Sequence, residues 1–297
     1  MAELSQYEEI LDRVVSFTSL CSGAVQNLEI HSVVPKIMCA QYENIGERVL
    51  ITDFAGRDSI AACIQILKDE EIDTIIPIGD IVPSRYGDTD SYSHNWNTLA
   101  KIVKDNYVGV DLKPWFIVDG QDFWTTLNQR YVKQITEKFG WFTPCIGCHF
   151  HFYAMRSVLV DILSHYTIIL ASGEKRLHKN GKRKANQTDA AVKSYSKFTH
   201  ERGIDHRFPI HNFEFEEQIS SLVGAEWNEG GSQMSCIHSG NDQDDNGQLK
   251  FTEEQILEMM ADYIIPMGKR YIELKMGSWG ENDFWDLMDN YSDELLR

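Results

Sequence analysis

Three of the six cysteines in this 297-residue sequence stand where a purely packing role is unexpected. Cys145 and Cys148 form a C-x-x-C pair just ahead of a predicted helix, and Cys236 lies in the polar stretch MSCIHSGN. A helix N-terminus lowers the pKa of a thiol and so favours the thiolate, which acts as a nucleophile or a metal ligand. The trio suits three-thiolate ligation of an iron–sulfur cluster with one iron left open, or a redox pair with a persulfide carrier.

A zinc site is another interpretation of the C-x-x-C motif. A single C-x-x-C supplies half of a structural zinc site, and the sequence has no second pair. His149 and His151 could complete such a site, although packing at a helix start is the simpler account of them. The remaining cysteines, Cys21, Cys39 and Cys63, are single, and we expect Cys39 and Cys63 in the core.

A second stretch with chemical potential is VLITDFAGRDSIAAC, residues 49–63. The apolar residues 49–52 predict a buried strand. A turn with Gly56 follows, and a helix is predicted to begin at Asp58 and Ser59. These parts gather free backbone N–H groups and the positive end of the helix dipole around one small volume. The arrangement suits phosphate or pyrophosphate, although an ordinary capped βα turn shows the same pattern.

The residues FAGRDS, 54–59, resemble the pyrophosphate-binding loop (PP-loop) of the ATP pyrophosphatases, usually written SGGxDS. Gly56, Asp58 and Ser59 match that pattern, whereas Phe54 and Ala55 replace its first Ser and Gly. Phenylalanine cannot donate the hydrogen bond of the lost hydroxyl, and alanine tolerates positive φ poorly. The loop is therefore expected to be tuned differently or to bind nucleotide more weakly.

The order of motifs extends this resemblance over residues 48–212. Several tRNA-thiolating PP-loop enzymes have a C-x-x-C leading into an Arg-bearing helix between the third and fourth strands. This chain has PCIGC, then Arg156, then the strand TIIL. Those enzymes continue with a turn of the form TGHxxDD. Here Ser172 and Gly173 match in place, but the histidine and the paired acids are absent, and Glu174 is one of the available substitutes.

The replaced turn contains the one strongly basic run of the sequence, residues 175–184. Placed beyond the fourth strand, it would overhang the same cleft as the PP-loop, where it could stabilise a polyphosphate or fold over it as a lid. A flexible solvated loop is the alternative. Elsewhere acid dominates, with a formal net charge of −17. Because nucleic-acid-binding proteins usually carry a basic field, unaided tRNA binding is disfavoured, and a small-molecule or nucleoside substrate fits better.

Composition indicates a globular protein, with 42% hydrophobic residues and 12 Tyr, 14 Phe and 7 Trp. No apolar run approaches the roughly 20 residues of a membrane span. The acidic N-terminus MAELSQYEE is typical of neither a signal nor a transit peptide. We therefore expect no membrane partner, a cytoplasmic location and reduced cysteines.

Strands alternate with helices from residue 48 onward, which predicts a doubly wound α/β fold with a parallel five-stranded sheet. The expected strands are 49–52, 74–78, 115–118, 167–170 and 207–210, and the expected helices are 58–69, 95–104, 122–139, 149–164 and 189–202. The resemblance implies the adenine nucleotide alpha hydrolase-like (HUP/PP-loop) architecture. We divide the chain into an N-terminal helical extension (1–46), the PP-loop domain (47–212) and a C-terminal helical region (213–297).

Two further loops could bind ligands. The polar loop after the second strand begins with Gly79 and Asp80 near the expected switch point, where it could contact nucleotide or substrate. A solvated surface loop explains it equally well. Residues 242–253, DQDDNGQLKFTE, fit the calcium-loop pattern, but an acidic turn ending in an N-cap at Thr252 explains most of this stretch.

The resemblance implies that ATP with Mg²⁺ is cleaved to AMP and pyrophosphate while an acceptor oxygen is adenylated. Asp58 would help to place the metal and act in catalysis. With Cys145 and Cys148 nearby, the nucleophile is most simply sulfur, transferred to a nucleobase or a small molecule, and with Cys236 they would hold a [4Fe–4S] cluster or Zn²⁺. The candidate nucleotide-binding residues are Phe54, Ala55, Gly56, Arg57, Asp58, Ser59, Gly79, Asp80, Ser172, Gly173, Glu174, Lys175 and Arg176.

Two alternatives stay open. One is an amide- or nitrile-forming ligase of the deazaguanine type that uses ammonia, although the four-cysteine zinc site of that family is absent. The other is a non-catalytic nucleotide sensor. The candidate protein partners are a second copy of the chain, forming a homodimer, and a sulfur-donor protein.

Overall fold

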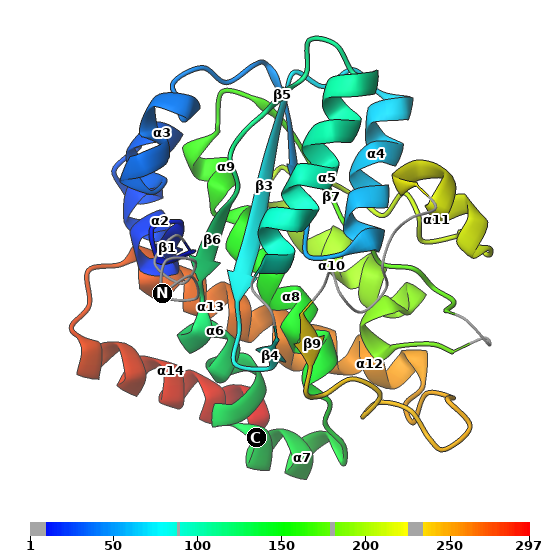
Figure 1. Cartoon of the computed structure of the whole chain (residues 1–297). Helices are drawn as coiled ribbons and strands as arrows, with labels where there is room; N and C mark the ends of the chain where they lie inside the picture. Colours follow the sequence, from blue (N-terminus) through cyan, green and yellow to red (C-terminus); the bar gives the residue numbers. More distant parts are fainter. Residues whose placement is uncertain (1–9, 88–89, 179–181, 225–233) are drawn as a thin grey trace, which may run out of the picture.

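A parallel β-sheet forms the centre of the computed structural model, which describes residues 10–87, 90–178, 182–224 and 234–297 (Figure 1). Six strands follow the order β1-β6-β3-β2-β7-β8, and β5 pairs with β3 to make seven. Every pair in this sheet is parallel. The strands are β1 Val14–Ser16, β2 Arg48–Thr52, β3 Thr74–Ile81, β5 Asp111–Leu112, β6 Phe116–Asp119, β7 Thr167–Ala171 and β8 Asp205–Arg207.

The parallel α/β sheet agrees with the prediction, but the expected count of five strands is wrong. Both additional strands, β1 and β5, are too short to show a period in the sequence. β1 lies in the stretch predicted to be helical, where Val14 pairs with Ile117 at the edge of the sheet. Helix α2 (Phe17–Val25) follows directly, with the Ser16 hydroxyl accepting a hydrogen bond from the Ser19 amide at 3.1 Å. The N-terminal segment is thus part of the sheet rather than a purely helical extension.

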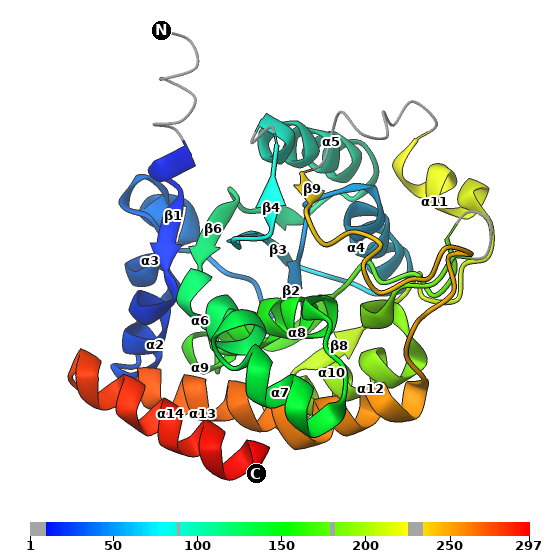
Figure 2. The same ribbon diagram turned by 90° about the horizontal axis from the view of Figure 1, so that it is seen from below.

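Helices cover both faces of the sheet (Figure 2). Alternate residues of β2 point into two separate cores: Leu50 packs on one side, and Val49 and Ile51 pack on the other. The smaller core lies under α4 (Arg57–Asp69), α5 (Asp90–Asn106) and α11 (Glu216–Val223). The larger core lies under α2, α8 (Pro144–Ser157), α9 (Leu159–Ile162), α10 (Asp189–Glu201), α12 (Glu253–Met259), α13 (Ile265–Met276) and α14 (Glu281–Leu296).

The strand order reverses between β2 and β7. From β2 the chain proceeds through β3 to β6 on one side, and it returns to β7 and β8 on the other side. At such a reversal the loops that leave two neighbouring strands diverge, and they open a crevice at the carboxyl edge of the sheet. The last residues of these strands, Thr52 and Ala171, are paired, so the loops after β2 and β7 start side by side.

Several elements differ in extent from the predictions. The helix expected at 122–139 is divided into α6 (Gln121–Thr125), a π-helical turn (Thr126–Arg130) and α7 (Val132–Phe139). Strand β8 starts two residues before the expected 207–210. Helix α8 begins five residues before the expected 149, with Thr143 as N-cap and Pro144 in the first turn. The C-x-x-C pair therefore lies inside the first turns of α8 and not ahead of the helix.

The C-terminal helices form a layer along the lower edge of Figure 2. The π-helical turn Met260–Ile264 joins α12 to α13, and α14 follows. The sequence pattern did not predict helix α13. Among the residues that the structure describes, shorter helical turns are α3 (Ile30–Val33) and the 3-10 segments Lys36–Tyr42 and Ala185–Gln187. An antiparallel ribbon joins β4 (Arg85–Tyr86) to β9 (Ser235–Cys236). Within the described ranges, no helix combines the length and apolar character that a membrane crossing requires.

Candidate functional site

A cavity of about 470 Å³ includes in its walls the loops that follow β2 and β7. It is here called the phosphate-loop cavity, after the predicted PP-loop at residues 54–59, which is called the phosphate loop below. The cavity therefore lies at the point where the strand order reverses, as expected for a ligand site in this class of sheet. Seven of the predicted nucleotide-binding residues line it: Ala55, Gly56, Arg57, Asp58, Ser59, Gly173 and Glu174.

Hydrogen bonds and a backbone contact fix the loops that line the phosphate-loop cavity. The Ser59 hydroxyl donates to the Gly56 carbonyl at 2.9 Å and accepts from the Gly56 amide at 3.2 Å, and the Ala55 amide donates to the Asp53 carboxylate at 2.9 Å. Gly173 comes so close that a Cβ atom there would lie 2.6 Å from the Ser59 amide nitrogen. The loops after β2 and β7 are therefore in direct backbone contact, which only glycine permits at this position.

Three predicted nucleotide-binding residues lie below the cavity. Phe54 is fully buried, with its ring 5.4 Å from that of Tyr92. Because β3 runs three residues further than predicted, Gly79 and Asp80 are inside the strand. Gly79 packs against Tyr92, and Asp80 forms a buried ion pair with Arg156. Burial raises the pKa of Asp80 to about 7, although the Arg156 charge opposes this shift.

Three more belong to the loop after β7 but do not line the cavity. The Ser172 hydroxyl is 2.8 Å from His206 Nε2. Lys175 forms an ion pair with Glu216 of α11, and Arg176 lies 3.6 Å from Asp189. Glu216 also pairs with Arg57, so one carboxylate links the loops after β2 and β7.

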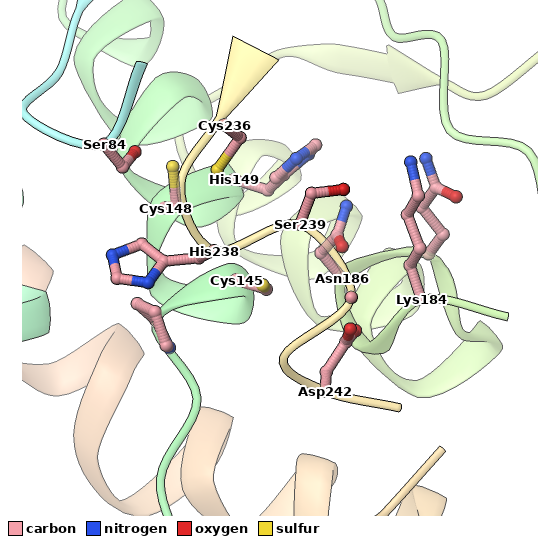
Figure 3. A pocket seen from close by; sticks show the side chains of 13 residues that line it. Ser84, Cys145, Cys148, His149, Lys184, Asn186, Cys236, His238, Ser239 and Asp242 are labelled. Atoms are coloured by element: carbon pink, nitrogen blue, oxygen red, sulfur yellow. The ribbon is translucent and has the colours of Figure 1, made fainter. Parts of the chain in front are cut away.

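All three candidate metal ligands line a neighbouring pocket of about 140 Å³, here called the cysteine pocket. Figure 3 shows Cys145 and Cys148 on α8 and Cys236 on the strand above them. The cysteine pocket and the phosphate-loop cavity share a wall. The residues lining both are Ser84, Cys148, His149, Lys184, Gln187, Cys236 and Ser239.

The ribbon β4–β9 brings Cys236 to this wall. Cys236 is the register partner of Arg85, and the Ile237 amide donates to the Ser84 carbonyl at 3.0 Å. Arg85 itself lines the phosphate-loop cavity, with its guanidinium 4.7 Å from the centre of the Phe152 ring. The sequence pattern does not single out Ser84, Arg85 or Tyr86, because a strand of two residues leaves no periodic signal.

The expected lowering of the thiol pKa is wrong. Burial raises the pKa of Cys145 to about 12, and the nearby Asp242 carboxylate adds to the rise. Burial also raises the pKa of Cys148 to about 11, although the Arg85 charge opposes it. Desolvation is the largest cause of both shifts. In the described ranges, no three Cys, His, Asp or Glu side chains are gathered as tightly as one metal ion requires.

The two histidines after the C-x-x-C motif have different surroundings. His149 lines both cavities, and its Nδ1 lies 2.8 Å from a Glu174 carboxylate oxygen. His151 is fully buried, with Nε2 2.9 Å from the Gly120 carbonyl, and burial lowers its pKa to about 3. His151 is therefore a core residue, as the simpler account proposed, whereas His149 faces the site.

The basic run and the acidic stretch 242–253 dock on each other. Arg183 pairs with Glu253 at 2.7 Å, and the buried Asp242 accepts a hydrogen bond from the Ala185 amide at 2.6 Å. The Thr252 hydroxyl caps α12, in agreement with the alternative of an acidic turn. Both end carboxylates of the candidate calcium loop are thus engaged within the protein. Lys184 lies on the shared wall, while residues 179–181 lie outside the described residues.

The sequence matches no protein-family model. It is similar to a protein of Methanocaldococcus jannaschii that carries the name Uncharacterized protein MJ0009. The two sequences are 32% identical over 218 residues, which cover 73% of this chain and 77% of that protein.

Proposed function

The chain belongs to the same family as the M. jannaschii protein MJ0009, and from its site we propose an ATP-dependent adenylating enzyme of the PP-loop kind. In the proposed reaction, ATP is cleaved to AMP and pyrophosphate while the carbonyl oxygen of an acceptor is adenylated. Sulfur then displaces AMP. The acceptor would be a nucleobase or a small molecule.

One observation carries this proposal: the cysteine pocket and the phosphate-loop cavity share a wall that includes Cys148 and Cys236. An acceptor adenylated in the larger cavity would already lie beside the cysteines. The reactive adenylate would not have to leave the protein to meet sulfur, which favours transfer over loss to water.

Several features of the phosphate-loop side support ATP as its ligand. The amides at the start of α4 and the positive end of its dipole suit the pyrophosphate part of ATP. The carboxylates of Asp53 and Asp58 line the cavity and are the kind of oxygen ligands that Mg²⁺ prefers. Arg85 and Lys184 also line it and would offset the charge that develops on the departing groups.

On the cysteine side we propose a cluster rather than a single ion. Cys145, Cys148 and Cys236 line one pocket and would supply three sulfur ligands. Among the described residues, no three side chains are gathered as tightly as a single zinc ion requires. When bound, a [4Fe–4S] cluster would supply an iron position without a protein ligand, to which sulfur can be attached.

The test is release of pyrophosphate and AMP from MgATP, with a mixture of free nucleosides and, separately, unfractionated tRNA as acceptors. We expect AMP release and continued turnover to require sulfide, because sulfur displaces AMP in the second step. Release of both products should be lost in Asp58→Asn, because that change removes a carboxylate from the phosphate loop. The exposed change Asp105→Asn is the control. Release with ammonium in place of sulfide would instead support the deazaguanine-type ligase. Binding of MgATP without any release would support the sensor.

A further inference from the structure

A buried carboxylate holds His149, which lies on the shared wall. Glu174 is 3% exposed, and its Oε1 accepts hydrogen bonds from His149 Nδ1 at 2.8 Å and from the Tyr153 hydroxyl. Its second oxygen, Oε2, is buried and has no hydrogen-bond partner among the described residues. Burying a carboxylate costs free energy, because the charge loses its hydration, so specific contacts must offset that cost. Here its contacts fix the imidazole of the residue that directly follows Cys148.

The hydrogen bond to Glu174 determines which ring nitrogen of His149 carries the proton. An ionised carboxylate only accepts hydrogen bonds, so Nδ1 must donate, and Nε2 of the neutral ring then carries the lone pair. The His149 side chain is 29% exposed, and within the described residues its Nε2 has no hydrogen-bond partner. The ring lines both cavities and therefore offers a proton acceptor at the place where an acceptor molecule would meet sulfur.

We propose that His149 is a catalytic general base and acid, and that Glu174 is the residue that positions it. This inference rests on the proposed function and assigns the proton transfers of the reaction. It also narrows the acceptor to a lactam, a carbonyl next to a ring N–H, because a base at this point is needed only if the acceptor loses a proton as its oxygen reacts.

In the first half of the reaction, the lactam oxygen forms a bond to the α-phosphorus of ATP. The bond from that phosphorus to the bridging oxygen breaks, and its electron pair leaves with pyrophosphate. The N–H proton passes to His149 Nε2, and the N–H electron pair forms a carbon–nitrogen double bond. The ring carbon then bears AMP as its leaving group.

In the second half, hydrosulfide forms a bond to that carbon, and the carbon–oxygen bond breaks with its electron pair leaving on AMP. The protonated His149 returns its proton to the ring nitrogen, and the S–H proton passes to solvent. The products are a thiolactam and AMP, and His149 is neutral again. Lys184 cannot replace His149 as the general base, since an ammonium group has no lone pair to accept a proton.

The kinetic test compares His149→Ala with the parent protein in the pyrophosphate-release assay. We expect kcat to fall by about 10²–10⁴-fold, the usual contribution of a general base, while the KM for MgATP is unchanged. Added imidazole should restore part of the rate. The exposed His165→Ala serves as the matched control and should behave as the parent protein. An unchanged kcat in His149→Ala, or a loss that imidazole does not restore, would overturn the proposal.

A second measurement needs no acceptor. In ¹⁵N-labelled protein, NMR of the imidazole nitrogens should show His149 as the Nδ1–H tautomer, and Glu174→Gln should reduce that preference while the fold is retained. An Nε2–H tautomer in the parent protein would overturn the inference. Absence of pyrophosphate release from the parent protein would overturn the proposed function instead, so the two failures can be told apart.

Discussion

The two halves of the candidate site are built in different ways. The phosphate-loop side comes from consecutive residues, because β2, the turn at Gly56 and α4 follow one another directly. The cysteine side is assembled from distant parts of the chain: α8 supplies Cys145 and Cys148, and a two-residue strand paired with β4 supplies Cys236. The first half is supported by the central sheet, whereas the second depends on a short ribbon and on docked loops.

This difference indicates how each half should respond to substitution. The phosphate-loop side should tolerate changes in distant loops and fail when backbone contacts at the sheet edge are disturbed. The cysteine side should respond to changes far from the cysteines in sequence. Substitutions in each half, and at the residue that joins them, can test that division.

Arg156 connects the two halves and should show the largest effect on stability. It lies on α8 at 1% exposure, pairs with Asp80 of β3, and approaches Asp53, before the phosphate loop, to 3.8 Å. Arg156→Met leaves Asp80 as a buried unpaired carboxylate, so we expect a loss of about 3–5 kcal/mol of unfolding free energy in urea titrations. The double variant with Asp80→Asn should recover much of this loss. A loss under about 1 kcal/mol in the single variant would mean that the pair does not hold the halves together.

Gly173→Ala should damage the phosphate-loop side alone. The added methyl group would lie 2.6 Å from the Ser59 amide nitrogen and 2.7 Å from the Asp58 carbonyl carbon, so the loop must move. We expect a cost of about 1–3 kcal/mol and loss of pyrophosphate release, with unchanged iron content. In the control Gly280→Ala, the nearest atom is the end of the Asp283 side chain at 3.3 Å. Full activity in Gly173→Ala would contradict the contact between the two loops.

His151 should make the protein less stable in acid. Burial lowers its pKa in the fold to about 3, whereas an unfolded histidine titrates near about 6.5. The unfolded chain therefore binds the extra proton, and stability falls as the pH drops from about 6.5 towards 3. At pH 5, the protonation of this histidine in the unfolded chain should lower the free energy of unfolding by about 2 kcal/mol. His151→Asn, measured by urea unfolding at pH 7 and pH 5, should remove that part of the slope, and an identical slope would refute the assignment.

Asp242→Asn should weaken the docking of the two loops at the cysteine pocket. The carboxylate accepts from the Ala185 amide at 2.6 Å, and loss of its charge should cost about 1 kcal/mol by thermal unfolding. Asp242 also contributes to the raised pKa of Cys145, so alkylation of Cys145 by iodoacetamide should become faster at a given pH. Glu201→Gln, in an exposed pair with Lys269, is the control and should change stability by less than about 0.5 kcal/mol. Equal alkylation rates in both variants would contradict the role of Asp242.

The same division explains what sequence reasoning could find. Apolar runs and a glycine turn identified β2, α4 and the phosphate loop, because these features repeat within a few residues. The grouping of Cys236 with Cys145 and Cys148 was also predicted, from its polar surroundings. The ribbon that brings it there was not, since β4 and β9 have two residues each and their pairing joins segments far apart.

Burial accounts for the remaining errors. Asp80 was expected to face a ligand, but the extra length of β3 turns it towards Arg156. The thiols were expected to have lowered pKa values, yet burial raises them, and desolvation depends on the packed structure. His149 and His151 look alike in sequence, and only the packing of α8 against Glu174 and Gly120 separates the site residue from the core residue.

Our main proposal is that residues distant in sequence form one sulfur-handling site beside the phosphate loop. Its most direct test is analysis of iron and labile sulfide in anaerobically purified protein, beside the variants Cys236→Ser and Cys39→Ser. We predict that the parent protein and Cys39→Ser retain both elements, and that Cys236→Ser loses them as Cys145→Ala/Cys148→Ala does. Equal iron and sulfide in Cys236→Ser and the parent protein, or neither element in the parent protein, would contradict the account.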